Sequence, residues 1–539
     1  MPLRRLKIPM STEVRLLLIC TALSLGGFLF GYNLVVMGGV ILMPNFTEKL
    51  EITQTLDVYI AIITTMMAAA FVGAILSGPL ADILGRRGLA IICTMITVVG
   101  DFLLVAANNL SMVYAGRAIT GFSIGMLSMT LPLYLTEIAP PFLRGRAIAI
   151  HQFCIILGIS IAFWVTYAST NFLRSRSWRL PLGIQLIPTL IFGLFLVFIP
   201  QSPRYLVQRH RDQEALESLA LIRGDGTTAH STVQMEFTEI KQTIMFEEKH
   251  KRNGYMYLFR HGEDRNFQRL LVGILAQAFQ QLTGANALML YAPIIFHRTD
   301  VNGHVPALFA NAISGLVMVV ATIPAVVWID RWSRRKTMIL GALGCCVCMI
   351  AMATVAGVNN YHASALEPIY YIQEQGELNT SVRINNPSAS SVIFFVMFYL
   401  FLGIYGCTWG PMGWIYPAEL YTQGVRSKAL GITTASNWFF TFGVVQLAPL
   451  AFHSIQWRIY VIYCILCLAI AVIVYAFFPE TQGKSLEEID LLFSGNFKTD
   501  DPNVHHPQTA SEALDLLEQK NSQYTTLFAF TDTAGFVDQ

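Results

Sequence analysis

Apolar runs of about 20 residues recur along the chain, each long enough to cross the roughly 30 Å hydrocarbon core of a bilayer. Because lipid offers backbone groups no hydrogen-bond partner, each run must be helical. Of the 539 residues, 54% are hydrophobic and 13% are charged, whereas soluble domains carry about 25% charged residues. The sequence therefore predicts an all-α polytopic membrane protein with about twelve transmembrane helices, near residues 14–42, 57–81, 88–107, 112–136, 146–168, 180–199, 268–294, 306–329, 336–357, 391–416, 428–451 and 456–478.

The sequence carries no pattern typical of metal or cofactor chemistry. "CCVC" at 345–348 lacks the ligand spacing of a zinc site. No nucleophile–base pair or phosphate-binding loop is recognisable, so we expect no enzyme, no cofactor, no metal and no nucleic-acid partner. The basic start "MPLRRLK" leads into a long apolar run without a cleavage motif, which indicates a retained first helix. All nine cysteines lie in apolar runs and are interpreted as buried thiols: Cys20, Cys93, Cys154, Cys345, Cys346, Cys348, Cys407, Cys464 and Cys467.

The distribution of basic residues indicates the orientation in the membrane. By the positive-inside rule the side richer in Lys and Arg is the cytoplasm, which places both termini inside a multi-pass protein of the cell membrane. Two glycosylation sequons, at Asn45 and Asn379, fall in loops assigned to the outside, where we expect both to be modified. The basic residues that share the inner side are Arg4, Arg5, Lys7, Arg86, Arg87, Arg144, Arg146, Arg334, Arg335, Lys336, Arg426 and Lys428.

A charged stretch with amphipathic segments such as "EALESLALI" divides six spans from six. We therefore expect a cytoplasmic N-terminus at 1–13, a six-helix bundle at 14–199, a cytoplasmic helical linker at 200–267, a second six-helix bundle at 268–478 and a cytoplasmic tail at 479–539. The polar composition of the tail predicts disorder beyond "SLEEIDLLF".

The two halves repeat their motifs. Asp82 precedes a pair of arginines in "ADILGRRG", and Asp330 precedes another pair in "IDRWSRRK". Glutamate and arginine have the same separation in "LTEIAPPFLRG" and in "PAELYTQGVRS". Internal repetition in a polytopic protein is typical of a transporter whose substrate site lies between two related bundles near the membrane midplane.

At these motifs the chain resembles the sugar porter family of the major facilitator superfamily, from about Leu25 to Leu486. The resemblance implies the major facilitator fold, with two six-helix bundles that alternate access to a small-molecule sugar. "WRLPLGIQLIP" (178–188) is most similar to fungal members. The motifs that carry the resemblance are "GRAITGFSIG" (116–125), "PLYLTEIAPPFLRGRA" (132–147), "PQSPRYL" (200–206), "QQLTGANALMLYAP" (280–293), "GPMGWIYPAEL" (410–420) and "PETQGKSLEEID" (479–490).

A sugar in a membrane needs neutral side chains that both donate and accept hydrogen bonds, together with an aromatic face for its C–H surface. The alternative for any single amide is a hydrogen bond between helices. Leu290 stands where the family usually has Tyr, and Met318 where many members have Asn, so the second half of the site is expected to be more apolar. His151 is interpreted as a packed neighbour. The residues that match the sugar-contacting positions of the family are Gln152, Gln280, Gln281, Asn286, Trp414 and Asn437, and Tyr291 is also kept.

Charged residues at the cytoplasmic ends of the helices predict a gate. Ion pairs between the bundles would hold the inner side shut and break on opening, which is the bistable element that alternating access requires. Anchoring by the positive-inside rule alone explains the arginines but not the acids at equal spacing. The residues assigned to this gate are Asp82, Arg86, Glu137, Arg144, Arg331, Glu419 and Arg426.

Asn33 bears on the energetics of transport. Arg117 is a basic residue well inside a span, and its expected depth matches that of Asn33. The resemblance implies that proton-coupled members carry Asp at this position, whose carboxylate pairs with the Arg and releases it on protonation. An amide has no accessible pKa and cannot do this. Asp101 lies in the third span at a similar depth, so it is a candidate partner for Arg117 and a candidate proton carrier.

The sequence thus predicts a monosaccharide transporter for a hexose or a pentose, working by facilitated diffusion without proton coupling. Three alternatives stay open. They are a proton-coupled sugar symporter, a sugar sensor that binds without transporting, and a carrier of a polyol or a cyclic acid.

Overall fold

The computed structural model describes residues 12–52, 56–140, 143–172, 174–223, 227–249, 254–259, 265–297, 304–359 and 389–484, together with Ile489 and Phe493. Within these residues all regular structure is helical, which confirms the all-α prediction. The first half contains α1 (Thr12–Val40), the short α2 (Pro44–Lys49), α3 (Leu56–Leu84), α4 (Arg86–Val105), α5 (Leu110–Ile138), α6 (Arg144–Ser169), α7 (Arg176–Ile184) and α8 (Leu186–Phe198).

The second half begins with a long span that is broken into pieces. It contains α13 (Asn266–Leu282), α14 (Ala285–Leu290), α15 (Ala292–His297), α16 (His304–Trp328), α17 (Arg334–Val358), α19 (Ala389–Cys407), α20 (Trp409–Leu420), α21 (Arg426–Ser454) and α22 (Arg458–Phe477). Four shorter helices connect the halves: α9 (Pro203–Gln208), α10 (Asp212–Arg223), α11 (Ser231–Lys249) and α12 (Tyr255–Phe259). Two 3₁₀ turns, η2 (Ile329–Arg331) and η3 (Gln423–Val425), precede α17 and α21.

Ten helical stretches of the described residues are long and apolar enough to cross a membrane. The two other predicted spans, near 268–294 and 428–451, correspond to α13–α15 and to α21. The first is interrupted at Gly284, whose φ of +85° is open to glycine and strained for other residues. Both stretches carry several amide side chains, which lower their hydropathy. The departure from uniform apolar helices therefore falls in the segments expected to bind substrate.

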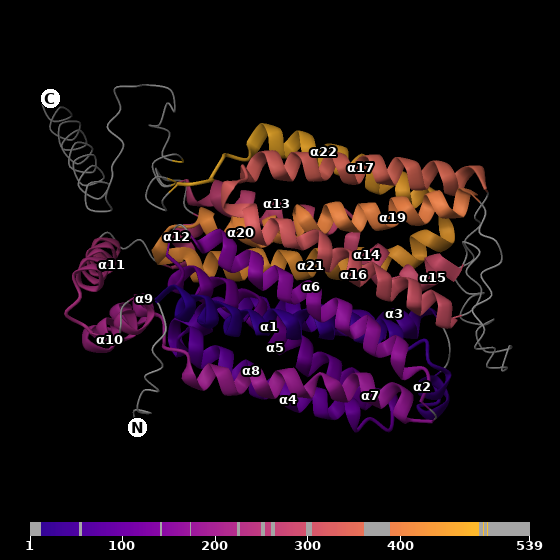
Figure 1. Ribbon diagram of the computed structural model, residues 1–539, viewed down its shortest axis with the longest axis horizontal. Helices are drawn as coiled ribbons and strands as arrows, with labels where there is room; N and C mark the ends of the chain where they lie inside the picture. The colour runs from indigo at the N-terminus through magenta and orange to yellow at the C-terminus, as the bar shows by residue number, and fades with distance from the viewer. Residues whose placement is uncertain are drawn as a thin grey trace, which may run out of the picture.

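The helices form two bundles that lie side by side with their long axes nearly parallel (Figure 1). One bundle holds α1 and α3–α8, and the other holds α13–α22. The bundles meet along two seams, where α3 packs on α21 and α6 packs on α16. Inside the first bundle α3 and α5 approach so closely that a Cβ on Gly125 would lie 2.1 Å from the carbonyl oxygen of Ala70. Small residues permit such close packing of membrane helices, where burial from water cannot drive association.

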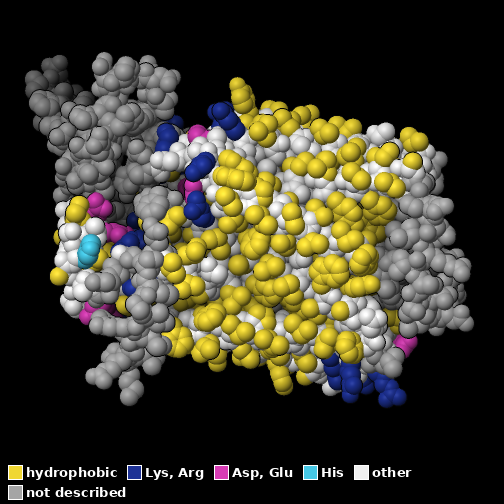
Figure 2. Space-filling view, viewed as in Figure 1, with side chains coloured by type: hydrophobic (Ala, Val, Ile, Leu, Met, Phe, Trp, Pro, Cys, Tyr) yellow, Lys and Arg dark blue, Asp and Glu magenta, His cyan; other side chains and the backbone are white. Residues whose placement is uncertain are grey.

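Apolar side chains cover the middle of the bundles, whereas Lys and Arg gather towards the ends (Figure 2). Large side chains such as Leu194, Leu340 and Ile465 are more than half exposed along this belt. An apolar belt of this kind is the surface that lipid acyl chains cover. We call the end where α3 turns into α4 and where α9–α12 lie the basic end; α2 and α15 lie at the opposite end (Figure 1).

The connecting helices are anchored to the first bundle at the basic end. The guanidinium groups of Arg86 and Arg209 both lie over the ring of Tyr205, at 5.5 and 5.8 Å from its centroid. Arg209 also donates to the carbonyl oxygens of Asp82 and Ile83. The connecting helices are therefore joined to the turn between α3 and α4, next to the gate predicted from the sequence.

Candidate functional site

A continuous chain of amide side chains crosses the second bundle near its centre. Asn286 donates to the Oε1 of Gln281 at 2.5 Å, and Gln281 donates to the Oε1 of Gln280 at 3.2 Å. Asn437 donates to the Oε1 of Gln280 at 2.8 Å and to the Oε1 of Gln277 at 2.6 Å. Gln280 donates in turn to the carbonyl oxygens of Trp409 and Gly410. Each amide keeps further donor or acceptor capacity, because a carboxamide has two N–H groups and two lone pairs.

Local helix geometry brings these residues together. Gln277, Gln280 and Gln281 lie on one face of α13, at spacings of three and four residues. The break at Gly284 re-aims the chain, so that Asn286 at the start of α14 reaches back to Gln281 across five residues. Gln277 is the polar residue that the sequence analysis missed, although its position one turn before Gln280 is a usable signal.

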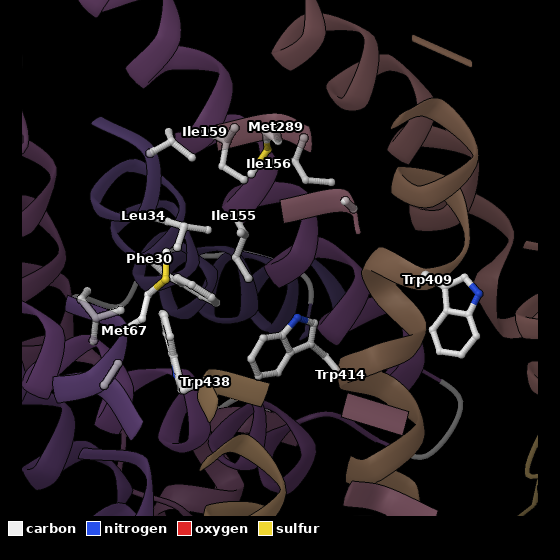
Figure 3. Packing of buried hydrophobic residues seen from close by; sticks show 14 of the residues in the cluster. Phe30, Leu34, Met67, Ile155, Ile156, Ile159, Met289, Trp409, Trp414 and Trp438 are labelled. Carbon is white, nitrogen blue, oxygen red and sulfur yellow. The ribbon is translucent and has the colours of Figure 1, made fainter. Parts of the chain in front are cut away.

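Aromatic and aliphatic side chains from both bundles pack together beside the helices that carry the amides. Phe30 of α1 lies edge-on to Trp414 at a centroid distance of 5.9 Å and tilted to Trp438 at 5.0 Å. Figure 3 shows these three rings close to Leu34 and Ile155. Of the amide positions predicted from the sequence, Gln152 is the one supplied by the first bundle. It packs against Gly410 of α20, and its Oε1 is buried without a hydrogen-bond partner.

Polar and apolar side chains occupy different parts of the candidate site. The second bundle supplies hydrogen-bonding amides, while the rings and branched side chains supply a surface suited to C–H groups. Trp438 also joins the bundles directly, because its Nε1 donates to the Oγ of Ser128 at 3.0 Å. Neither Phe30 nor Trp438 stands out in the sequence, since an aromatic residue in an apolar span is indistinguishable there from ordinary packing.

The residue pair at Leu290 and Tyr291 belongs to the end of the site opposite the basic end. Tyr291 donates to the carbonyl oxygen of Val445, and its ring lies 6.3 Å from that of Tyr59 in the first bundle. Leu290 lies next to Gly38 of α1. These contacts join α14 to the first bundle, so both residues close the site rather than extend the amide chain. Met318 is buried in α16 beside Gly406 of α19.

At the basic end, one ion pair links helices within each bundle, whereas the sequence analysis expected Arg86, Glu137 and Glu419 to pair between the bundles. Arg86 contacts Glu137 at 2.8 Å in the first bundle, and Arg334 contacts Glu419 at 3.1 Å in the second. The sequence analysis placed Arg331 in the gate, but Arg331 is exposed on η2, and it is Arg334 that pairs with Glu419. Arg334 begins α17 and also donates to the carbonyl oxygens of Ile329 and Trp332, contacts that spacing along the sequence does not reveal.

Two further ion pairs join the bundles. Asp82 contacts Lys428 at 3.2 Å and accepts a hydrogen bond from Ser427 at 2.9 Å. Asp330 contacts Arg146 at 3.6 Å. Lys428 follows Arg426 exactly as Arg146 follows Arg144, so the two contacts occupy repeated positions in the halves. Arg144 and Arg426 are themselves buried, and Arg426 donates to the carbonyl oxygen of Tyr421.

The site is closed towards both ends in this structure. The ion pairs of Asp82 and Asp330 close the basic end, while the rings of Tyr59 and Tyr291 close the other. Gln280, Gln281 and Asn437 are accordingly 3% exposed or less. Such a closed arrangement is one of the states through which alternating access must pass.

Arg117 and Asn33 are in contact, but not through their two side chains. Arg117 donates to the backbone carbonyl of Asn33 at 2.9 Å and to the carbonyls of Ile62 and Ile63 at 3.3 and 3.2 Å. The amide of Asn33 donates to the carbonyl of Leu29, and its Oδ1 is buried without a partner. The two residues therefore meet, as their depth predicts, but through the backbone of Asn33.

The structure describes one of the two predicted glycosylation sites. Asn45 lies on α2, at the end opposite the basic end, and its amide donates to the Oγ of Ser177 at 3.3 Å. Asn379 lies outside the described residues. His151, next to Gln152, is buried, and both of its ring nitrogens are without a hydrogen-bond partner.

Comparison with known proteins agrees with this geometry. The family model described as "Sugar (and other) transporter" matches residues 19–493. A high-affinity glucose transporter of Kluyveromyces lactis is 30% identical over 475 residues, covering 88% of this chain and 84% of the relative. High-affinity glucose transporter 1 of Candida albicans is 32% identical over 471 residues, covering 86% and 83%. The solved structure of the proton:xylose symporter XylE bound to 6-bromo-6-deoxy-D-glucose is similar with a TM-score of 0.74 and 24% identity, covering 89% of this chain and 100% of that one.

The fold and the family match define a multi-pass membrane transporter built from two helix bundles. The chain belongs to the sugar porter family of the major facilitator superfamily, and it is a sugar transporter rather than an enzyme.

Proposed function

We propose that the protein carries a monosaccharide, a hexose or a pentose, across the plasma membrane by alternating access. The chain of five amides from Gln277 to Asn437, faced by Phe30 and Trp414, supports a polyhydroxylated cargo with an apolar face. The relatives described as glucose transporters favour a hexose among such cargoes. The amides of Gln152, Gln280, Gln281, Asn286 and Asn437 are proposed to bind the hydroxyl groups.

We further propose that transport is facilitated diffusion without proton coupling. The observation that carries this proposal is the buried amide at Asn33, whose backbone holds Arg117. An amide keeps the same charge at every pH that a cell encounters, so it cannot alternate between binding and releasing the guanidinium as a carboxylate can. The basic end is proposed to face the cytoplasm, with both termini inside and with Asn45 glycosylated outside.

The purified protein in liposomes tests both parts of the proposal. Labelled glucose, xylose and a polyol are followed with and without an imposed pH gradient. Equilibration of a monosaccharide, with no accumulation above the external concentration when the gradient is applied, is the expected result. Accumulation driven by the gradient would contradict the uncoupled mechanism, and equilibration of the polyol alone would contradict the sugar. Binding of a sugar without any flux would identify a sensor instead.

Asn437→Ala is the matched variant for the sugar site, with Ser436→Ala on the same helix as its control. Ser436 is half-buried and donates to the carbonyl of Ile274, outside the amide chain. Loss of sugar binding in the first variant and its retention in the second are expected, whereas equal behaviour of the two would place the site elsewhere.

A further inference from the structure

Arg117 brings a full positive charge into the first bundle without an acid beside it. Its side chain is 0% exposed, and the three groups that accept its hydrogen bonds are neutral backbone carbonyls. Carbonyl dipoles stabilise the guanidinium locally, but they do not cancel its charge. A buried charge inside a membrane protein is costly unless an opposite charge lies near it.

Asp101 on α4 is a buried acid that also lacks an opposite charge in contact with it within the part of the chain that the structure describes. Its side chain is also 0% exposed, and its Oδ1 is without a hydrogen-bond partner. The Oγ1 of Thr189 lies 3.4 Å from its Oδ2 but only 2.7 Å from the carbonyl of Gln185. A hydroxyl has one hydrogen, so the closer carbonyl takes most of this bond and Asp101 is left weakly held. The carboxylate therefore has no strong local partner among the described residues.

The helices that carry the two charges touch at the residues next to them. Gly100 precedes Asp101 and Gly116 precedes Arg117. A Cβ on Gly100 would lie 3.1 Å from the carbonyl oxygen of Gly116, and a Cβ on Gly116 would lie 3.1 Å from that of Gly100. The backbones of α4 and α5 therefore cross in contact at this point, and the two ionisable groups lie at the same depth on adjacent helices.

The pair does not form a contact ion pair, since neither residue has an ion-pair partner within 4.0 Å among the described residues. In a low-dielectric interior the attraction between opposite charges decays slowly, so separation beyond contact does not abolish it. Tyr32 from α1 and Gln185 and Thr189 from the α7–α8 segment are the polar groups that share the surroundings of Asp101.

We propose that Asp101 is the fixed counter-charge of Arg117, a positioning residue that keeps the guanidinium on the carbonyls of Asn33, Ile62 and Ile63 throughout transport. The inference rests on the proposed function and explains how Asn33 can be uncharged. Because α4 and α5 belong to one bundle, the two charges stay together in every state of the carrier. Arg117 is then compensated without taking up or releasing a proton, and Asp101 stands behind the site rather than in the path of the sugar.

A double-mutant cycle tests the interaction between Asp101 and Arg117 independently of transport. Asp101→Asn, Arg117→Gln and the double variant are produced with a fluorescent tag, and the fraction that elutes as monodisperse protein from a sizing column is measured. Each single variant leaves one buried charge uncompensated, so each is expected to give several-fold less folded protein. The double variant is expected to recover to above either single variant. If the losses simply multiply, the two charges do not interact and the proposal is wrong.

Relocating the acid provides a readout that a merely structural role would not change. Asn33→Asp combined with Asp101→Asn moves the carboxylate from behind Arg117 to the side of the site. Sugar exchange in liposomes is expected to recover relative to Asp101→Asn alone and to become dependent on pH between about 5 and 8, whereas the wild type is independent of pH there. A double variant that exchanges sugar no better than Asp101→Asn, or without pH dependence, would overturn the proposal.

Thr189→Val is the matched control, because it removes the hydroxyl beside Asp101 and leaves both charges in place. It is expected to retain the yield and the pH-independent exchange of the wild type. If the wild type itself moves no monosaccharide, the proposed function fails while the folding cycle still decides the role of Asp101. The two failures are therefore distinguishable.

Discussion

The gate predicted from the sequence implies that the two ion pairs that join the bundles set how often the basic end opens. Asp82→Asn removes the pair with Lys428, together with a 3.6 Å contact to Arg86 inside the first bundle, while keeping an oxygen that accepts from Ser427. Asp330→Asn removes the pair with Arg146. The side chains are 20% and 30% exposed in the first pair and 43% and 22% in the second. Partly exposed pairs contribute about 0.5–1 kcal/mol each after solvent screening. The pairs lie on different helices and do not share a partner, so their contributions should add.

The double variant should therefore favour opening of the basic end by about 1–2 kcal/mol, which corresponds to a change of about 5–30-fold in the ratio of open to closed protein. Dyes on non-canonical amino acids at Phe198 of α8 and Lys336 of α17 report this opening by energy transfer, since both positions are exposed near the basic end. High salt should reduce the difference between wild type and variant, because exposed charges are screened within about 3 Å at 1 M.

Asp57→Asn is the control, because Asp57 is exposed at the other end of the same helix as Asp82. It should leave the distribution of dye separations unchanged. A double variant whose distribution matches that of Asp57→Asn would refute the assignment of these pairs as a gate. A shift that is insensitive to salt would refute the electrostatic explanation of it.

Three further predictions concern the site and the second bundle. Asn437→Ala leaves the Oε1 of Gln277 unpaired and removes one of the two hydrogen bonds to the Oε1 of Gln280, which should weaken sugar binding by about 1–3 kcal/mol, or about 5–150-fold, in a titration calorimeter; unchanged affinity would exclude Asn437 from recognition. Phe30→Ala removes two ring contacts worth about 1 kcal/mol each, so binding should weaken about tenfold or more while Leu34→Ala has a smaller effect. Burial alone would raise the pKa of Glu480, but hydrogen bonds from Ser333 and from the backbone N–H groups at the start of α17 lower it below its ordinary range. Its stabilisation is therefore present at neutral pH and lost as pH falls through the lowered pKa, so Glu480→Gln should unfold at a lower temperature than wild type at pH 7, and this difference should shrink below about pH 4.

The sequence predicts the fold because its strongest signals are local. An apolar run in lipid has one solution, a helix, and the order of the runs predicts the bundles. The repeated motifs likewise predict a charged interface at the basic end. The identity of the partners could not be predicted, because it depends on how turns direct side chains after the helices have packed. Arg331 and Arg334 are equally basic in the sequence, but η2 leaves the first on the surface and α17 brings the second to Glu419.

The sequence analysis found the polar residues of the candidate site and missed its aromatic residues. An amide in an apolar span stands out, so Gln280 and Asn437 could be identified, whereas Phe30 and Trp438 could not be distinguished from core residues. The meeting of Arg117 with the backbone carbonyl of Asn33 was also beyond reach, since every residue carries such a carbonyl. Backbone partners leave no trace in the sequence.

The amide side chains are divided unequally between the two bundles, whereas the ion pairs at the basic end are divided equally. The amide chain lies on α13, α14 and α21, all in the second bundle, whereas the first bundle supplies Gln152 and the ring of Phe30. Closing the site thus requires the first bundle to bring only one amide and an apolar surface onto a cargo already hydrogen-bonded by the second. The ion pairs at the basic end are instead divided evenly between the bundles, with Asp82 and Asp330 in repeated positions. In the proposed mechanism, an asymmetric site inside a symmetric gate lets the second bundle hold the sugar while either end opens, because no contact within the amide chain has to break for the bundles to separate.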